Sequence, residues 1–263
     1  MEQITVLTAT DLHLKPTLYD QLALAVAKHR PAVTCLIGDF LDHKAEGWDL
    51  HRYNHLSPKA AAKRLAALPG ELGFTLGNHE SYGWDEFYDA WTETGRPLNV
   101  LHGSALAVGP LKIVGFPCAT GGMTEFRGVW QPSSKHYNAW LPQLLWAENA
   151  AAQTLWLMHE PPVAELGDAV WAVNDVWREA IDLYQPILTV SGHDHRLPVE
   201  SDVWSVGRGR VTTCVNVGQT VSPIPGPLRY CLITFEFPSR TPSLPARTSV
   251  ERLIWPMPDC VPF

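Results

Sequence analysis

The stretch QITVLTATDLH, residues 3–13, joins an apolar run to two polar side chains. Residues 3–9 are mostly apolar or β-branched, which is typical of a buried strand. Asp11 and His13 follow directly and stand two positions apart, so both point to the same side of an extended segment. The sequence therefore predicts a strand with a carboxylate and an imidazole at its carboxyl end.

Polar residues also follow directly after four further apolar runs, at 33–37, 73–76, 154–158 and 187–190. The polar groups that follow them are Gly38-Asp39, Gly77-Asn78-His79-Glu80, His159-Glu160 and Gly192-His193-Asp194-His195. Ligands of open α/β sheets gather outside the carboxyl ends of the strands, so five such ends can converge on one place. Imidazole, carboxylate and amide oxygen suit iron, manganese or zinc, and no cysteine joins them, which argues against a structural zinc site. The glycines allow sharp turns beside a crowded centre.

Helical patterns separate the apolar runs. We expect helices at 18–29, 58–68, 84–94 and 175–184, with Ser57-Pro58 and Asn174 as start signals. After residue 195 the pattern changes to strands alone, at about 211–217 and 229–236, followed by a proline-rich tail. This alternation is typical of an α/β fold with a second sheet packed on the first.

Composition indicates a soluble protein of ordinary type. Hydrophobic residues make up 46% of the 263 residues and charged residues 18%, and no apolar run approaches the ~20 residues that span a bilayer. The N-terminus lacks the basic region of a signal peptide, so we expect a cytoplasmic protein without membrane contact. Five cysteines without a C-x-x-C pair predict free, buried thiols. The net charge of -7 weighs against nucleic-acid binding without excluding it.

In order and spacing, D-x-H, G-D-x-x-D (Gly38 to Asp42), G-N-H-E, a strand-terminal His and G-H-x-H resemble the calcineurin-like metallophosphoesterase family over residues 5–195. The resemblance implies an α/β fold, a four-layer α/β/β/α sandwich of two mixed sheets. It also implies a single domain over 1–263, with a proline-rich C-terminal extension from about 238.

The resemblance further implies two divalent metal ions, with manganese or iron ahead of zinc or magnesium. One ion would be bound by Asp11, His13, Asp39 and His195, and the other by Asp39, Asn78, His159 and His193. Two such ions about 3.5–4 Å apart can hold a bridging hydroxide and clamp the phosphoryl oxygens during in-line attack. By the same resemblance, His79 stabilises the phosphoryl group or protonates the leaving oxygen, and Asp42 orients His79.

Substrate contacts are predicted from loops beside these strand ends. Arg52 and Arg196 are the arginines suited to a bidentate phosphate contact, and the segment 43–55 should lie near the metals. Residues 118–140 are rich in glycine, polar and aromatic residues, which is typical of a loop that covers a site, with Trp130, His136 or Tyr137 as contributors.

The expected activity is hydrolysis of a small or cyclic-nucleotide-type phosphodiester. Phosphomonoester hydrolysis, including that of phosphoproteins, is the main alternative, followed by nuclease action and by a non-catalytic protein-binding scaffold. The complete ligand set and His79 disfavour the scaffold. The sequence leaves the oligomeric state open.

Overall fold

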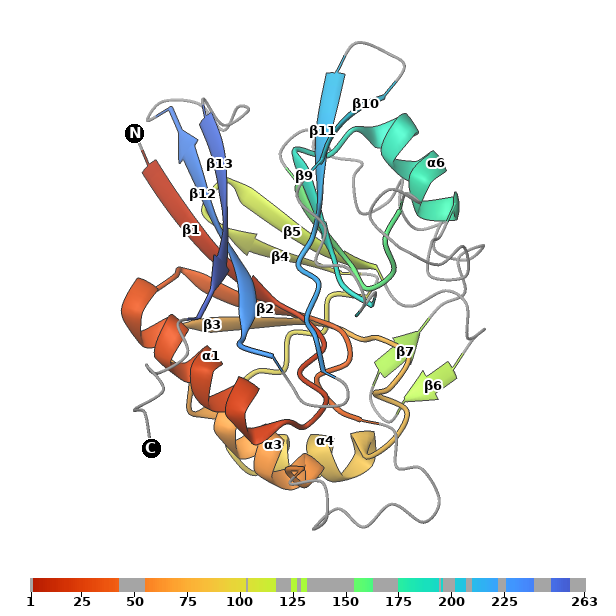
Figure 1. The fold of residues 1–263 in the computed structure, drawn as a ribbon. Coiled ribbons are helices and arrows are strands. Elements are labelled where there is room, and N and C mark those ends of the chain that lie inside the picture. Colours follow the sequence, from red (N-terminus) through yellow and green to blue (C-terminus); the bar gives the residue numbers. More distant parts are fainter. Residues whose placement is uncertain are drawn as a thin grey trace.

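A computed structural model of the chain describes residues 2–42, 55–102, 104–116, 124–126, 129–131, 154–162, 175–193, 195, 202–206, 210–221, 226–238 and 247–255. Two β-sheets that face each other form its centre (Figure 1).

The first sheet has the strand order β13-β12-β1-β2-β3. Its strands are β1 (Glu2–Ala9), β2 (Val33–Ile37), β3 (Glu71–Thr75), β12 (Arg229–Phe237) and β13 (Arg247–Ile254). β2 runs parallel to both β1 and β3, whereas β12 is antiparallel to β1 and to β13. The carboxyl ends of β1, β2 and β3 therefore meet at one edge of this sheet.

The second sheet has the order β10-β11-β9-β8-β5-β4. Its strands are β4 (Ala105–Val108), β5 (Leu111–Phe116), β8 (Thr154–Met158), β9 (Leu188–Ser191), β10 (Asp202–Val206) and β11 (Arg210–Asn216). β8 runs parallel to β5 and β9, so its carboxyl end lies beside that of β9. A separate two-stranded pair consists of β6 (Thr124–Phe126) and β7 (Val129–Gln131).

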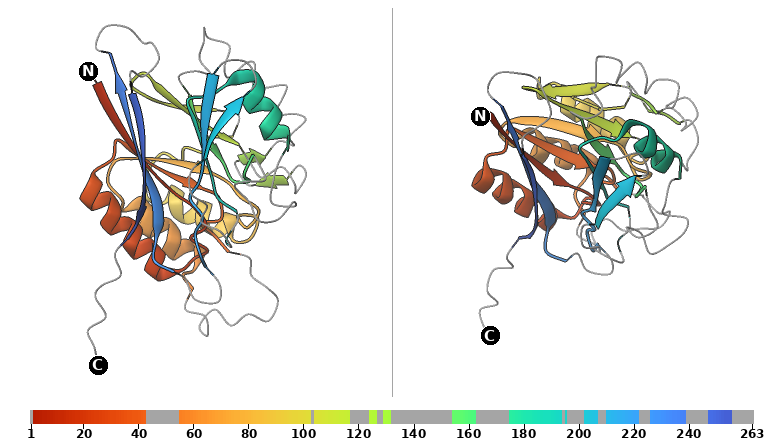
Figure 2. Two further views of the ribbon diagram at one scale, coloured as in Figure 1. Left: turned by 45° about the horizontal axis from the view of Figure 1, so that its top comes forward. Right: turned by 90° about the horizontal axis from the view of Figure 1, so that it is seen from above.

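Helices cover the outer faces of both sheets. α1 (Pro16–His29), α3 (Pro58–Ala66) and α4 (Trp84–Thr92) cover the first sheet, and α6 (Asp175–Tyr184) lies by the second. In both views of Figure 2, α1 and α6 lie on opposite sides of the paired sheets. Ser57 begins α3 as predicted, because its hydroxyl accepts a hydrogen bond of 3.1 Å from the Ala60 amide.

Alternation of side chains along the strands produces the layers. In β1, Leu7 and Ala9 pack against the helices, whereas Ile4 and Val6 pack between the sheets. On the outer face of the second sheet, Phe116 has its ring 4.6 Å from that of Trp156 and 4.9 Å from that of Trp177 on α6. The predicted four-layer α/β/β/α arrangement is confirmed.

The predicted strands and helices are all present with shifts of a few residues at their ends. β6, β7, β10 and β13 were not predicted. β6 and β7 lie within segment 118–140, which was predicted to be a loop, and β13 lies within the segment interpreted as a proline-rich extension. Cys35, Cys214 and Cys231 are free and buried as expected, whereas Cys118 and Cys260 lie outside the described residues. Within the described ranges, every helix is too short or too polar to cross a membrane.

Candidate metal centre

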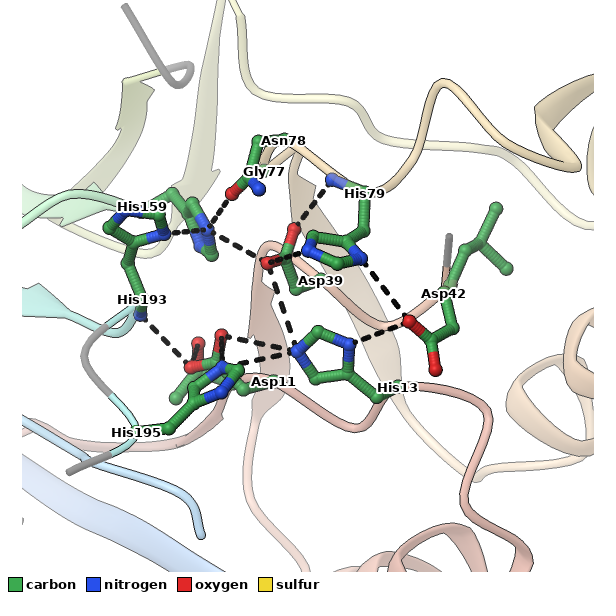
Figure 3. A network of polar contacts seen from close by, with 12 residues as sticks. Asp11, His13, Asp39, Asp42, Gly77, Asn78, His79, His159, His193 and His195 are labelled. Atoms are coloured by element: carbon green, nitrogen blue, oxygen red, sulfur yellow. Dashed lines mark hydrogen bonds and ion pairs between the residues drawn. The ribbon is translucent and has the colours of Figure 1, made fainter. Parts of the chain in front are cut away.

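The polar residues that follow five strands converge between the two sheets (Figure 3). Strands β1, β2 and β3 bring residues from the first sheet, and β8 and β9 bring residues from the second. The side chains so placed are Asp11, His13, Asp39, Asp42, Asn78, His79, His159, His193 and His195. Each predicted metal-binding or catalytic residue thus reaches the cluster.

Several of these residues have a left-handed backbone. The φ angles are 54° at Asp11, 44° at His13, 51° at Asp39 and 68° at His193. This conformation is uncommon for residues other than glycine, and such strain gathers at functional sites, where the surrounding structure enforces it. The backbone at these residues is therefore strained, and their side chains point toward one another.

Glycines beside the cluster leave room for its side chains. A Cβ atom would lie 2.2 Å from His159 Nδ1 at Gly38, 2.2 Å from Asp39 Oδ1 at Gly77, and 1.9 Å from Thr10 Oγ1 at Gly192. Gly38 also has a φ of +75°. These distances agree with the expectation that the turns need glycine because the centre is crowded.

The first donor group consists of Asp11, His13, Asp39 and His195. His195 Nε2 lies 3.2 Å from Asp11 Oδ1 and 3.1 Å from His13 Nε2. His13 Nε2 lies 3.8 Å from Asp39 Oδ2. Three of these residues come from the first sheet and one from the second.

The second donor group shares Asp39 with the first. His159 Nε2 lies 3.2 Å from Asp39 Oδ2, 3.0 Å from Asn78 Oδ1 and 3.2 Å from His193 Nδ1. The opposite nitrogen of His159, Nδ1, donates to the Ile37 carbonyl oxygen at 3.0 Å. That bond leaves Nε2 of His159 directed at the donor group.

The two groups fit divalent cations. Donor atoms about 2.1 Å from one cation stand roughly 3.0–3.4 Å apart in octahedral or tetrahedral geometry. The closest separations in both groups, 3.0–3.2 Å, fall in this range. Asp11 and Asp39 are 0% and 1% exposed, and carboxylates buried so deeply are normally paired or bound to metal.

The buried carboxylates and imidazoles shift one another's pKa values. Burial alone would raise the pKa of Asp39, but the charge of His159 and its hydrogen bond pull that pKa well below its ordinary value. Burial opposes a charged His159, yet Asp39 raises the pKa of His159 to about 10. Burial and the charge of His159 lower the pKa of His193 to about 4. These surroundings favour a charged His159 and a neutral His193 when no metal is bound.

His79 stands beside the two groups with Asp42 behind it (Figure 3). Its Nδ1 lies 3.2 Å from Asp42 Oδ1, and its Nε2 faces Asp39 Oδ2 at 3.9 Å. Burial would lower the pKa of His79, but the hydrogen bond with Asp42 and the charge of Asp39 raise it. The side chain of His79 is 25% exposed.

Glu80 supports the cluster in a way that sequence reasoning missed. Its Oε2 accepts hydrogen bonds from the Asp39 amide at 3.0 Å and the Gly77 amide at 2.5 Å, and its Oε1 accepts one from the Leu41 amide at 3.1 Å. Burial raises the pKa of Glu80 to about 7, while the amide donors oppose this rise. The position of Glu80 in the G-N-H-E motif is the sequence feature that could have predicted this role.

His55 lies next to Asp42, and Lys15 contacts His55. His55 ends segment 43–55, which was predicted to lie near the metals, whereas Lys15 was not predicted. His55 Nε2 is 3.6 Å from Asp42 Oδ2, and Lys15 Nζ contacts the same nitrogen of His55. Nothing in the local sequence marks Lys15 or His55 as a pair, since they are 40 positions apart.

The predicted substrate-contact residues Arg52, His136 and Arg196 lie outside the described residues, as do segment 43–54 and the side chains of 118–140. Their proposed contacts stay predictions.

Comparisons with known proteins agree with this architecture. The chain resembles a protein of Thermus thermophilus with a TM-score of 0.62 and 12% identity, covering 97% of this chain and 100% of that one. It resembles a dimetal phosphatase from Danio rerio with a TM-score of 0.61 and 13% identity, covering 96% and 99%. These likenesses concern the fold, and no curated protein sequence matches the chain. The family model of calcineurin-like phosphoesterases matches residues 4–197, which carry the whole donor cluster. The chain therefore belongs to the calcineurin-like phosphoesterase family.

Proposed function

We propose that the protein is a binuclear metal-dependent phosphoesterase that hydrolyses a small phosphodiester. The observation that carries this proposal is the pair of donor groups sharing Asp39 Oδ2, with His79 beside them. Family membership makes the chain a phosphoric ester hydrolase, and the donor pair extends that statement to two metals and to named residues.

The proposed ligands are those of the two groups. Asp11, His13, Asp39 and His195 would hold one cation, and Asp39, Asn78, His159 and His193 the other. Manganese or iron is proposed first, since imidazole with carboxylate and amide oxygen suits them, and zinc or magnesium next. Bound divalent cations supply Lewis-acid chemistry, activating water and neutralising charge on the phosphoryl oxygens.

His79 and Asp42 are proposed to handle the proton of the leaving group. Asp42 accepts the hydrogen bond from His79 Nδ1, which fixes the ring and favours its charged form. A proton on Nε2 can then pass to the departing oxygen, a general-acid role that suits an imidazole. The role matters most for alkoxide leaving groups, which are poor without protonation.

A phosphomonoesterase is the second candidate, because the similar Danio rerio structure is a dimetal phosphatase. A non-catalytic scaffold is disfavoured by the complete donor set and by His79. The cytoplasm is the proposed location, following the sequence.

The test is a metal add-back assay on stripped protein. Bis-p-nitrophenyl phosphate and p-nitrophenyl phosphate are assayed in parallel with manganese, iron(II), zinc or magnesium restored. Metal-dependent hydrolysis with a faster diester rate supports the proposal, and a faster monoester rate moves it to the second candidate. The exposed Asp85 on α4 offers a matched control, since Asp85→Asn should behave as wild type. No hydrolysis with any metal, despite two bound ions per chain, would contradict the proposed activity.

A further inference from the structure

Thr10 is a buried threonine that follows β1 and precedes Asp11. It is 1% exposed. Its hydroxyl oxygen lies 2.6 Å from Asp11 Oδ2 and 2.7 Å from the Ile37 carbonyl oxygen. The hydroxyl therefore lies where the carboxyl ends of β1 and β2 meet, in contact with a member of the first donor group.

The hydroxyl of Thr10 carries one hydrogen, which it can donate to only one of these two oxygens at a time. The carboxylate of Asp11 is the stronger acceptor because it is charged. The Ile37 carbonyl has another donor, since His159 Nδ1 donates to it at 3.0 Å. The hydrogen of Thr10 is therefore assigned to Asp11 Oδ2.

The two oxygens of Asp11 have separate partners. Oδ2 accepts hydrogen bonds from the Thr10 hydroxyl and from the His193 amide, which is 3.0 Å away. Oδ1 lies 3.2 Å from His195 Nε2 and 3.9 Å from His13 Nε2. The carboxylate thus presents Oδ2 to donors of the protein and Oδ1 to the group that would bind the first cation.

The surroundings of the Thr10 hydroxyl are tightly packed. A Cβ atom at Gly192 would lie 1.9 Å from Thr10 Oγ1, so the backbone that leads to His193 packs directly on the hydroxyl. Thr10 and Asp11 are both buried, so solvent competes only weakly for their hydrogen bond. The hydroxyl is therefore a fixed donor behind the carboxylate.

We propose that Thr10 is a positioning residue of the candidate metal centre: its hydroxyl donates to Asp11 Oδ2 and so keeps Asp11 Oδ1 turned toward His195 and the first cation. This inference rests on the proposed function for the two metals, and it adds a residue outside both ligand sets. Because Asp11 belongs only to the first donor group, the effect should fall on one of the two cations.

Manganese titration of the metal-free protein, followed by calorimetry, tests the inference. Thr10→Val keeps the shape of the side chain and removes the hydroxyl, whereas Thr10→Ser keeps the hydroxyl. Wild type should bind two ions, and Thr10→Val should weaken one of them by about 10–100-fold and leave the other unchanged. Thr10→Ser should bind both ions as wild type does. Wild-type affinity for both ions in Thr10→Val would overturn the inference.

Thr34→Val is the matched control. Thr34 on β2 is also 1% exposed, and its hydroxyl has no hydrogen-bond partner in the described part of the chain. Thr34→Val should bind both ions as wild type does. Thr10→Ala is a second variant without the hydroxyl, in case Thr10→Val does not fold, and should show the same selective loss. Equal weakening of both ions in the Thr10 and Thr34 variants would reflect disturbed packing and would overturn the inference.

Double variants identify the cation that is affected. His195→Ala removes a proposed ligand of the first cation, and Asn78→Ala removes one of the second. Adding Thr10→Val to Asn78→Ala should weaken the ion that remains by the factor seen in the single variant, whereas adding it to His195→Ala should leave the remaining ion unchanged. The opposite pattern would overturn the inference.

The same titrations separate this inference from the proposed activity. Two bound ions, a selective loss in Thr10→Val and no hydrolysis of either ester would support the inference and contradict the activity. Two bound ions with hydrolysis, but without a selective loss in Thr10→Val, would overturn the inference and leave the activity supported. A wild-type protein that binds no ion would contradict both.

Discussion

Asp39 is the residue on which both donor groups depend. Its Oδ2 lies 3.2 Å from His159 Nε2 and 3.8 Å from His13 Nε2, and its side chain is buried. Asp39→Asn removes the negative charge that both cations would share, so we expect metal-dependent hydrolysis to fall more than about 100-fold. Elemental analysis should show the bound metal falling from two ions per chain. Wild-type activity with two ions retained would contradict the shared role of Asp39.

His79 should affect rate without affecting metal. It belongs to neither of the two proposed ligand sets, and its Nδ1 is engaged by Asp42. His79→Ala should keep two ions per chain and lose about 10²–10⁴-fold in kcat on alkyl esters, with a smaller loss on p-nitrophenyl esters. An equal loss on both leaving groups would contradict a general-acid role.

Metal binding should release protons because of His159. Its pKa in the metal-free protein is raised to about 10, so at pH 7 it carries a proton on Nε2 that a metal ligand must lose. Metal affinity should therefore increase as pH rises from 6 to 9. Calorimetry in buffers of different ionisation enthalpy should detect release of at least one proton at pH 7. Zero release would contradict His159 as a ligand.

At the scale of elements, the sequence predicted those strands and helices that have a clear local pattern of apolar residues. Continuous apolar runs revealed β2 and β8 because both faces of these strands are buried. β13 was missed because it is an edge strand with mostly exposed or half-buried positions, including Glu251 and Arg252, and so lacks an apolar run. The left-handed φ angles at Asp11 and Asp39 were not predicted, because nothing in the local sequence pattern marks them. Hydrogen bonds such as Asp11 N to Gly38 O, at 3.1 Å, join segments far apart in sequence.

Glu80 joins the loops after β2 and β3, and its removal should loosen both. Glu80→Gln replaces one accepting oxygen by an NH₂ group that faces backbone N–H donors. A buried donor left without an acceptor costs about 1–3 kcal/mol, so the free energy of unfolding should fall by that amount in urea titration. Glu86→Gln on the exposed face of α4 is the control. Equal stability of the Glu80 variant and the control would contradict the proposal that Glu80 stabilises the loops after β2 and β3.

At the scale of the whole molecule, the donor groups connect the two sheets. The first sheet supplies Asp11, His13, Asp39 and Asn78, and the second supplies His159, His193 and His195. Each proposed cation would have ligands from both sheets. Elsewhere the sheets meet through an apolar interface that includes Val6, Ile37 and Leu157. The candidate metal centre is thus the polar end of an otherwise hydrophobic contact between the sheets.

Removing the metal should therefore weaken the whole fold and not only the site. A cation that binds only the folded chain stabilises it by about 2.7 kcal/mol at a concentration 100 times its Kd. For a chain of this size that corresponds to a fall in Tm of roughly 5–10 °C when chelator is added, followed by recovery when manganese is restored. The Asp39→Asn variant should show a smaller change with chelator, because it lacks the shared carboxylate. Scanning calorimetry at fixed protein and metal concentrations measures both shifts. An identical Tm with and without metal would mean that the cations do not link the two sheets.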